Sequence, residues 1–418
     1  MKLYIFAALM VALFGHSTFA QHKENLWDYA EEYYERKEYA SATAFYQRLL
    51  NSKSFKIPAM QRLVQCYRYT NNTEEALYYA QLLAKKAPSD TNRMLQGILL
   101  KETGQYEEAK QAFLMLHGKY PTVLKYAVPL RSCDSSLAWI KAKNRHKITN
   151  LSWANSPYSE ISPSLSNQNK LVFASNREGI FIKKKDKFSG EAYYDLYETA
   201  LEGTEGSPIL FSAKINSVHH EYAPSFSKTG DSIYFTRSID RSKASDDTIN
   251  RVKLYCAFKE PSKNWGDAHI FFLNDSLFSF ADPFMDPSGK MFFFASDMKG
   301  GYGNSDLYVC FKKDSVWTRP VNLGPVINSS ANETYPFYHK GMLYFSSDSQ
   351  QGMGGYDIFS AIQKRGDWVK ITNMKCPINS PYDDFALIIS KDGKSGFFSS
   401  NRPEGKGKED LYQIIFSE

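Results

Sequence analysis

The sequence of 418 residues predicts two kinds of fold in one chain, an N-terminal α-helical solenoid followed by an all-β propeller of five blades. Three observations predict this fold class. Residues from about 23 to 121 repeat with a period of 33 or 34 residues, and residues from about 147 to 418 repeat with a period of 51 to 62 residues. Such periods are typical of solenoids and propellers. Aromatic residues make up 15% of the chain, which favours a large β component because rings pack well on pleated sheets.

The first twenty residues have the pattern of an export signal. Lys2 precedes an apolar run from Leu3 to Phe14, and Thr18 and Ala20 are small residues at the positions that a signal peptidase reads. Twelve helical residues span roughly 18 Å, which is too short for a bilayer core of about 30 Å. We therefore expect residues 1–20 to be a cleaved signal peptide. The mature chain would have no transmembrane segment and would lie in the periplasm or peripherally at the outer membrane.

The composition argues against several functional classes. The 51 basic and 45 acidic residues give a formal charge of +6, which is too mild to predict a nucleic-acid partner. No His-Glu-x-x-His motif, phosphate-binding loop or Gly-x-Ser-x-Gly elbow occurs, so we expect no metal, no cofactor and no catalytic residue. The cysteines have no metal-ligand spacing, and buried free thiols are the favoured interpretation, although their pairing stays open. They are Cys66, Cys133, Cys256, Cys310 and Cys376.

The helical repeat consists of three helix–turn–helix units. Ala42, Ala76 and Ala109 are 34 and 33 residues apart, each where a first helix turns into a second. Pro88 and Pro121 close two of the units, because proline cannot continue a helix. These residues resemble the tetratricopeptide repeat. The resemblance covers residues 21–121, and residues 122–146 would form a capping helix and a connector, with a break near Pro129.

In the tetratricopeptide family, the first helix of each unit lines a concave groove. The resemblance therefore implies a partner-binding surface on this chain. An alternative is that Trp27, Met94 and Ile98 complete the packing between repeats while the charged residues are solvated. The groove positions are Trp27, Glu31, Tyr34, Glu35, Gln61, Gln65, Arg68, Tyr69, Met94, Ile98, Lys101 and Glu102.

The second repeat region carries five copies of a short β pattern. Each copy has an apolar run, then a polar turn, then a strand that in four copies begins with Asp and in one with Lys253. The last Phe of each run is Phe173, Phe235, Phe294, Phe345 or Phe398. The final copy lacks a fourth strand, and an extra strand from Lys147 to Leu151 precedes the first copy. Pairing the two would close the ring over residues 147–418 and hide two sheet edges. Five blades are predicted, with six as the alternative.

The phrases SPSLSNQNKLVFASNREG and DPSGKMFFFASDMKGGYGNSDLYV resemble the TolB-type, WD-repeat-like propeller family. In four of the five copies an acid stands five residues after the Asn that starts the copy. These acids are Glu160, Glu221, Glu333 and Asp384. They predict a ring of carboxylates near one mouth of the central channel, which could hold a basic tail or a cation. The alternative is that they cap backbone N–H groups.

The export signal, the helical repeats and the propeller together resemble the N-terminal part of Bacteroidota envelope proteins. Members of that group continue into an OmpA-like domain, and some belong to type IX secretion and gliding systems. The resemblance implies a non-catalytic scaffold that binds a protein partner, an outer-membrane or periplasmic component of the envelope. The alternative is a propeller glycosidase or glycan-binding protein that uses the channel-mouth carboxylates.

Overall fold

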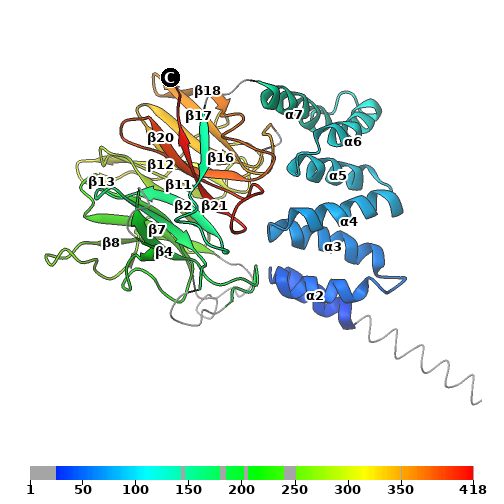
Figure 1. Ribbon diagram of the computed structural model, residues 1–418, viewed down its shortest axis with the longest axis horizontal. Coiled ribbons are helices and arrows are strands. Elements are labelled where there is room, and N and C mark those ends of the chain that lie inside the picture. The colour runs from blue at the N-terminus through cyan, green and yellow to red at the C-terminus, as the bar shows by residue number, and fades with distance from the viewer. Residues whose placement is uncertain are drawn as a thin grey trace, which may run out of the picture. The chain divides into compact units, whose positions relative to one another are not determined.

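The computed structural model describes residues 25–142, 146–178, 185–201, 206–239, 251–349 and 351–417 (Figure 1). The expected signal peptide, residues 1–20, lies outside the described residues. Contacts divide the chain into two compact units. One runs to Leu100 and includes residues 185–191, and the other contains most of the chain from Lys101 onward. Among the described residues, no helix has the length and apolar character needed to cross a membrane.

The N-terminal region is an α-solenoid of consecutive helices, as predicted. Ala42, Ala76 and Ala109 are fully buried near the starts of second helices, where a small side chain allows close helix packing. The helices are residues 25–35, α2 (Tyr39–Leu49), α3 (Lys56–Tyr69), α4 (Thr73–Lys86), α5 (Asp90–Glu102), α6 (Tyr106–Lys119) and α7 (Leu124–Lys141).

Helix α7 differs from the expectation of a break at Pro129. The helix continues through Pro129, which is buried together with Tyr126 and Cys133. Proline removes one backbone N–H, but packing of the buried face retains the helix. Helices α6 and α7 belong to the same compact unit as the propeller. In that unit the Ser132 hydroxyl donates to the Gly352 carbonyl over 2.5 Å.

The propeller has five antiparallel sheets, which confirms five blades and not six. Blade 1 contains β2 (Glu160–Leu165), β3 (Lys170–Ser175), β4 (Asp195–Ala200) and β5 (Ile209–Leu210). Blade 2 contains β6 (Glu221–Phe226), β7 (Ser232–Ser238), β8 (Val252–Phe258) and β9 (His269–Ile270). Blade 3 contains β10 (Phe280–Met285), β11 (Met291–Ser296), β12 (Asp306–Lys313), β13 (Val316–Trp317) and β14 (Val321–Asn322).

Blades 4 and 5 complete the ring. Blade 4 contains β15 (Glu333–His339), β16 (Met342–Ser347), β17 (Asp357–Lys364) and β18 (Asp367–Asn373). Blade 5 contains β19 (Asp384–Ile389), β20 (Ser395–Ser400), β21 (Asp410–Ile415) and β1 (Lys147–Asn150). Strand β1 pairs antiparallel with β21, from Lys147 opposite Ile415 to Asn150 opposite Tyr412, so the closing strand lies where the sequence predicted it.

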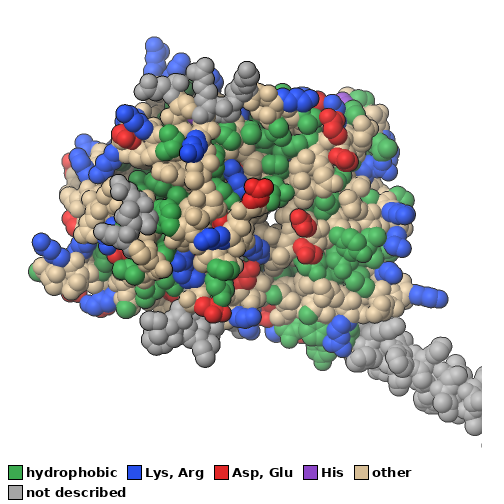
Figure 2. Space-filling model, in the orientation of Figure 1, with side chains coloured by type: hydrophobic (Ala, Val, Ile, Leu, Met, Phe, Trp, Pro, Cys, Tyr) green, Lys and Arg blue, Asp and Glu red, His purple; other side chains and the backbone are tan. Residues whose placement is uncertain are grey.

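The apolar runs form the second strand of each blade. Their Phe side chains are at most 3% exposed, which makes them part of the core of the propeller. On the face drawn in Figure 2, basic and acidic side chains are interspersed with apolar ones, in keeping with the mild net charge.

The innermost strand of every blade has a register break after its second residue. Such β-bulges bend a strand and redirect side chains. The residue at each break has a φ between 50° and 57°, which non-glycine residues rarely adopt. We call these five residues the bulge ring: Ser162, Ala223, Asp282, Tyr335 and Ala386.

The backbone N–H groups of three bulge-ring residues donate to hydroxyls of the neighbouring blade. Ser162 donates to the Ser399 hydroxyl over 2.9 Å and Ala386 to the Ser346 hydroxyl over 3.2 Å. Asp282 likewise donates to the Thr236 hydroxyl over 2.9 Å. At the equivalent position facing Tyr335, the neighbouring blade has an alanine and offers no hydroxyl. The Asp282 carboxylate takes over that role.

Candidate functional site

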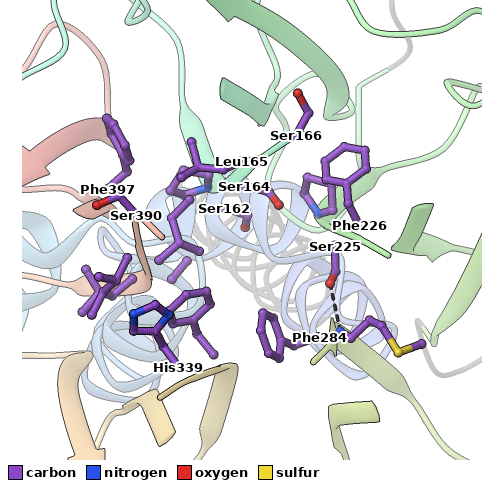
Figure 3. A pocket seen from close by; sticks show the side chains of 18 of the residues that line it. Ser162, Ser164, Leu165, Ser166, Ser225, Phe226, Phe284, His339, Ser390 and Phe397 are labelled. Atoms are coloured by element: carbon purple, nitrogen blue, oxygen red, sulfur yellow. Dashed lines mark hydrogen bonds between the residues drawn. The ribbon is translucent and has the colours of Figure 1, made fainter. Parts of the chain in front are cut away.

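A cavity of about 910 Å³ lies where the five innermost strands converge. Its lining extends from the bulge ring to the hairpins that follow these strands, and every blade contributes (Figure 3). This volume is in the range of small-molecule binding sites. We call this cavity the central pocket and treat it as the candidate site.

Asp282 provides the only carboxylate of the bulge ring, at the inner end of the central pocket. Its side chain is 5% exposed, and its Oδ2 accepts the Tyr335 N–H over 3.3 Å. Its Oδ1 is buried and has no hydrogen-bond partner among the described residues. Burial raises the pKa of Asp282 to about 7, against a smaller opposing effect of the Tyr335 amide. Asp282 therefore exchanges a proton near neutral pH.

Tyrosines surround Asp282 rather than cations. The rings of Tyr222, Tyr335 and Tyr356 lie close enough for Asp282 to raise their pKa, although burial is the larger cause for each. The phenols therefore stay neutral. In this surrounding the protonated form of Asp282 is favoured, because a charged carboxylate without a cationic partner is costly to bury.

The walls of the central pocket combine rings with hydroxyls. Phe284 and Phe337 meet edge to face with ring centroids 5.0 Å apart. Ser225, which accepts the Met285 N–H over 3.0 Å, is one of the serines on the wall (Figure 3). Apolar surface next to spaced hydroxyls suits a ligand that has both apolar faces and polar edges.

His339 lies farther out along the same pocket. Its ring stacks on Phe337 at 6.0 Å and 13°, and its Nε2 is buried without a hydrogen-bond partner among the described residues. Burial, with a smaller effect of Lys340, lowers the pKa of His339, so the imidazole is neutral near pH 7. His339 is four residues beyond Tyr335 on β15, which corresponds to roughly 13 Å along the strand.

The four carboxylates predicted at a channel mouth do not line the central pocket. All four are at most 1% exposed. Each accepts the backbone N–H of a serine four residues earlier, for example Ser156 to Glu160 over 2.8 Å and Ser217 to Glu221 over 3.0 Å. The same holds for Glu333 with Ser329 and for Asp384 with Ser380. Instead of an exposed ring of carboxylates, the structure shows capped turns.

Arginines complete this capping in three blades. Arg177 binds Glu160 at 3.0 Å and Arg237 binds Glu221 at 2.7 Å, and Arg402 pairs with Asp384. In blade 4, Glu333 instead accepts a hydrogen bond from the Ser347 hydroxyl over 2.8 Å.

Blade 3 departs from the pattern, because Phe280 stands at the position of the acid. Lys253 from blade 2 lies 5.5 Å from the Phe280 ring centroid and donates to the carbonyls of Asp275 and Phe278. A buried cation thus binds this turn where the other blades use a buried acid.

The groove residues expected on the solenoid are largely engaged in internal packing. Trp27 stacks on Phe55 at 5.4 Å, and Glu31 receives two hydrogen bonds from Arg62, at 2.9 and 2.6 Å. The Arg62 guanidinium in turn lies 4.2 Å from the centroid of Tyr34. The exposed members are Glu35, Gln61 and Tyr69, and the half-buried ones are Gln65, Arg68, Met94, Ile98 and Glu102.

Lys101 corrects the groove assignment. It is 1% exposed, and its Nζ has no hydrogen-bond partner among the described residues. Burial lowers its pKa, while the nearby Asp357 carboxylate acts in the opposite direction. A side chain buried in this way cannot present its charge to a partner. The five cysteines are all free thiols, and all but Cys376 are buried.

The described residues contain no group of three or more His, Cys, Asp or Glu side chains arranged to hold a metal ion. Sequence reasoning missed both Asp282 and His339. Asp282 precedes Pro283 where other copies have Ser, Ala or Tyr before proline, and this departure from the repeat was the available signal. His339 gave no signal, since a lone histidine at a strand end belongs to no motif.

No protein-family model and no curated protein sequence matches this chain. Among solved structures, the chain is similar to an α-L-arabinofuranosidase from Lactobacillus brevis, at 11% identity over 64% of this chain and 92% of that one, with a TM-score of 0.39. It is similar to Zg3597, a family 117 glycoside hydrolase from Zobellia galactanivorans, at 12% identity over 65% and 90%, with a TM-score of 0.38. It is also similar to a puromycin-hydrolysing peptidase of Mycobacterium tuberculosis, at 12% identity and a TM-score of 0.35. That match covers 58% of this chain and 35% of the peptidase.

These structures correct the functional expectation drawn from the sequence. They are hydrolases, so the expectation of a non-catalytic scaffold, and of a protein that is not an enzyme, is contradicted. The four repeated carboxylates cannot serve the alternative of a propeller that acts on glycans in the central pocket, because they do not line it. At this level of identity the likeness shows the fold alone. The reaction has to be argued from the central pocket.

Proposed function

We propose that this protein acts on carbohydrates, which bind in the central pocket, and that Asp282 is the acid of the reaction. One observation carries the proposal: Asp282 is a buried carboxyl group whose Oδ1 has no partner among the described residues, and it lies on a cavity of about 910 Å³. Buried polar groups without a partner are uncommon in folded proteins, and one that lies on a cavity can receive its missing hydrogen bond from a ligand.

Carbohydrate is the ligand chemistry that suits the walls. A sugar ring has apolar C–H faces that pack on Phe284 and Phe337, and hydroxyl edges that bond to serines such as Ser164 and Ser225. A carboxylic acid whose pKa lies near neutral pH can protonate the oxygen of a glycosidic bond. In that step the proton moves from Asp282 to the leaving oxygen, and the bond from this oxygen to the anomeric carbon breaks. Water then adds to the carbon and returns a proton to Asp282.

The export signal expected over residues 1–20 supports a place outside the cytoplasm, where envelope glycans are found. The resemblance to exported TolB-type propellers supports the same location. N-terminal sequencing of protein secreted across the inner membrane tests this part of the proposal. A start at Gln21 is expected, and retention of Met1 on cytoplasmic protein would contradict it.

The experiment for the activity compares two aspartate variants in the mature protein. A panel of nitrophenyl glycosides and plant and algal oligosaccharides is incubated with wild type, Asp282→Asn and Asp267→Asn, and new reducing ends are measured. Asparagine keeps an oxygen that accepts the Tyr335 N–H, so the substitution removes the proton and spares the hydrogen bond. The control Asp267 has a side chain that is 77% exposed.

We expect Asp282→Asn to lower hydrolysis by about 10²- to 10⁴-fold, the usual contribution of a general acid. Asp267→Asn should match wild type. Full activity in Asp282→Asn would contradict the proposal, and so would a wild type that neither binds nor cleaves any carbohydrate of the panel.

A further inference from the structure

The rim of the central pocket differs from one side to the other. On blades 5, 1 and 2 the lining residues at the rim are Lys391, Asn167 and Lys228. On blades 3 and 4 they are Pro287 and Tyr338, next to His339. One side therefore offers ammonium and amide groups, and the other offers apolar and aromatic surface.

The lysine side of the rim carries charge that is not neutralised within the protein. Lys228 and Lys391 are exposed, and among the described residues their ammonium groups form no ion pair or hydrogen bond. Two further lysines, Lys340 and Lys394, lie close enough to Asp392 to lower its pKa, although hydrogen bonds to Asp392 are the larger cause. Lys340 belongs to blade 4, and neither Lys340 nor Lys394 lines the central pocket. We call the two lining lysines, Lys228 and Lys391, the lysine arc.

Asp392 is the one carboxylate that faces the lysine arc among the described lining residues. Its Oδ1 already accepts the Ser390 hydroxyl over 2.6 Å and the Lys394 N–H over 2.9 Å. The described lining on this side of the rim therefore has two ammonium groups, those of Lys228 and Lys391, and one carboxylate, whose charge Lys340 and Lys394 offset. A surface of one dominant sign at the mouth of a cavity raises the local concentration of ligands of the opposite sign and speeds their entry.

The inner end of the pocket, in contrast to the rim, disfavours anionic groups. No cation of the described residues shifts the pKa of Asp282, and its ionised form would repel a second anion. An uncharged hydroxyl or glycosidic oxygen is accepted there. The lysine arc lies beyond the bulge ring, because Lys391 is in the turn after β19, and the strand from Ala386 to its end at Ile389 spans roughly 10 Å. A ligand that reaches both ends is longer than one sugar ring.

We infer that the carbohydrate bound by the central pocket is an acidic oligosaccharide, with its carboxylate or sulfate groups at the lysine arc and an uncharged part at Asp282. This inference rests on the proposed function and names its substrate class. The lysine arc contributes attraction and orientation, whereas Asp282 contributes the proton. The two contributions can therefore be separated by experiment.

The probes are trigalacturonate, its fully methyl-esterified form and a sulfated galactotriose, each titrated into the mature protein by calorimetry. The ester has the same length and shape as trigalacturonate without its charge. The sulfated sugar separates a requirement for carboxylate from a requirement for any anion. The variants are Lys228→Gln with Lys391→Gln, and a control pair, Lys263→Gln with Lys370→Gln, at exposed positions outside the central pocket.

We expect wild type to bind at least one anionic probe ten-fold or more tightly than the ester. The Lys228→Gln, Lys391→Gln protein should lose that advantage, along with most of the salt dependence of binding, and the control pair should keep both. Equal affinity for the ester and the anionic sugars, or unchanged anion binding in the rim variant, overturns the inference while an effect of Asp282→Asn leaves the proposed function standing. Binding of none of the three probes overturns the inference as well.

Discussion

Two sets of carboxylates in the propeller have opposite surroundings. Glu160, Glu221, Glu333 and Asp384 arise from the repeat, and their oxygens accept hydrogen bonds from serines, with arginines added in three blades. Asp282 occurs once, at a bulge, and one of its oxygens has no partner among the described residues. A residue that recurs in four of five copies meets a structural need that these blades share. A residue that breaks the repeat is free to serve a need of the ring as a whole.

Blade 3 shows both sides of this contrast. It is the blade without the repeated acid, since Phe280 occupies that position and Lys253 binds the turn. It is also the blade that places Asp282 in the bulge ring. The structural acid and the candidate functional acid are thus two residues apart in register, and they occur in different blades.

The contrast depends on a closed ring, and opening the ring should have the largest effect. Replacing Lys147–Leu151 with a Gly-Ser segment of equal length removes β1, which pairs with β21. It also removes the buried side chain of Leu151. We expect loss of the cooperative thermal transition and aggregation through the exposed strand edge. The same replacement at Ile209 and Leu210, the exposed outer strand of blade 1, should leave the transition within a few degrees of wild type.

Removing a repeated acid should destabilise the protein strongly. Glu221→Ala leaves Arg237 buried without its partner, and losing one member of such a pair costs about 3–5 kcal/mol. Urea unfolding measures the change, with Glu260→Ala as control because that side chain is 47% exposed. If Glu221→Ala unfolds at the same urea concentration as wild type, the repeated acids are not structural.

Blade 4 sharpens this test because its acid has no arginine. Glu333 is held by hydroxyl and amide donors alone, from Ser329 and Ser347. Glu333→Ala should cost about 1–3 kcal/mol in urea unfolding, the penalty for leaving buried donors unsatisfied. A loss as large as that of Glu221→Ala would show that the arginine adds nothing.

Much of the fold could be read from the sequence, because the repeats impose it. The Phe runs, the closing strand from Lys147 and the five blades all follow from period and alternation. The continuity of α7 through Pro129 could not be predicted, because burial of one helix face outweighed the tendency of proline to break a helix. The burial of Lys101 could not be predicted either, since helical periodicity does not show which face of a helix another element will cover. The role of Asp282 depends on a β-bulge and on the absence of a hydroxyl opposite the Tyr335 N–H in the neighbouring blade. Neither feature has a sequence motif.

Replacing Asp282 should affect stability in a pH-dependent way. Its folded-state pKa of about 7 exceeds the ordinary value of 3.8, so between these values the folded protein binds more protons than the unfolded chain. The contribution of Asp282 to stability therefore falls as pH rises from about 4 to 7. Asp282→Asn lacks this loss, so it should be more stable than wild type at pH 8 relative to pH 4.5. Thermal unfolding at the two pH values measures the difference, and identical shifts in both proteins would contradict it.

The smallest effect is expected at His339. His339→Gln should weaken binding of trigalacturonate by about 1 kcal/mol, roughly five-fold, because one hydrogen bond to the ligand is lost. The buried Nε2 of His339 is the group that would make this bond. His269→Gln, on the exposed outer strand β9, serves as the control. Unaltered affinity in His339→Gln would restrict the ligand to the inner part of the central pocket.

Asp282 is thus a buried acid on the central pocket with a pKa raised to about 7 and one oxygen that has no partner among the described residues, whereas the repeated acids accept hydrogen bonds from serines. Carbon-13 NMR of aspartate side chains follows its carboxyl directly, with Asp282→Asn used to assign the signal. We expect a titration midpoint near pH 7, which moves when a carbohydrate is added. A midpoint near the ordinary value of 3.8, unmoved by any carbohydrate, would contradict it.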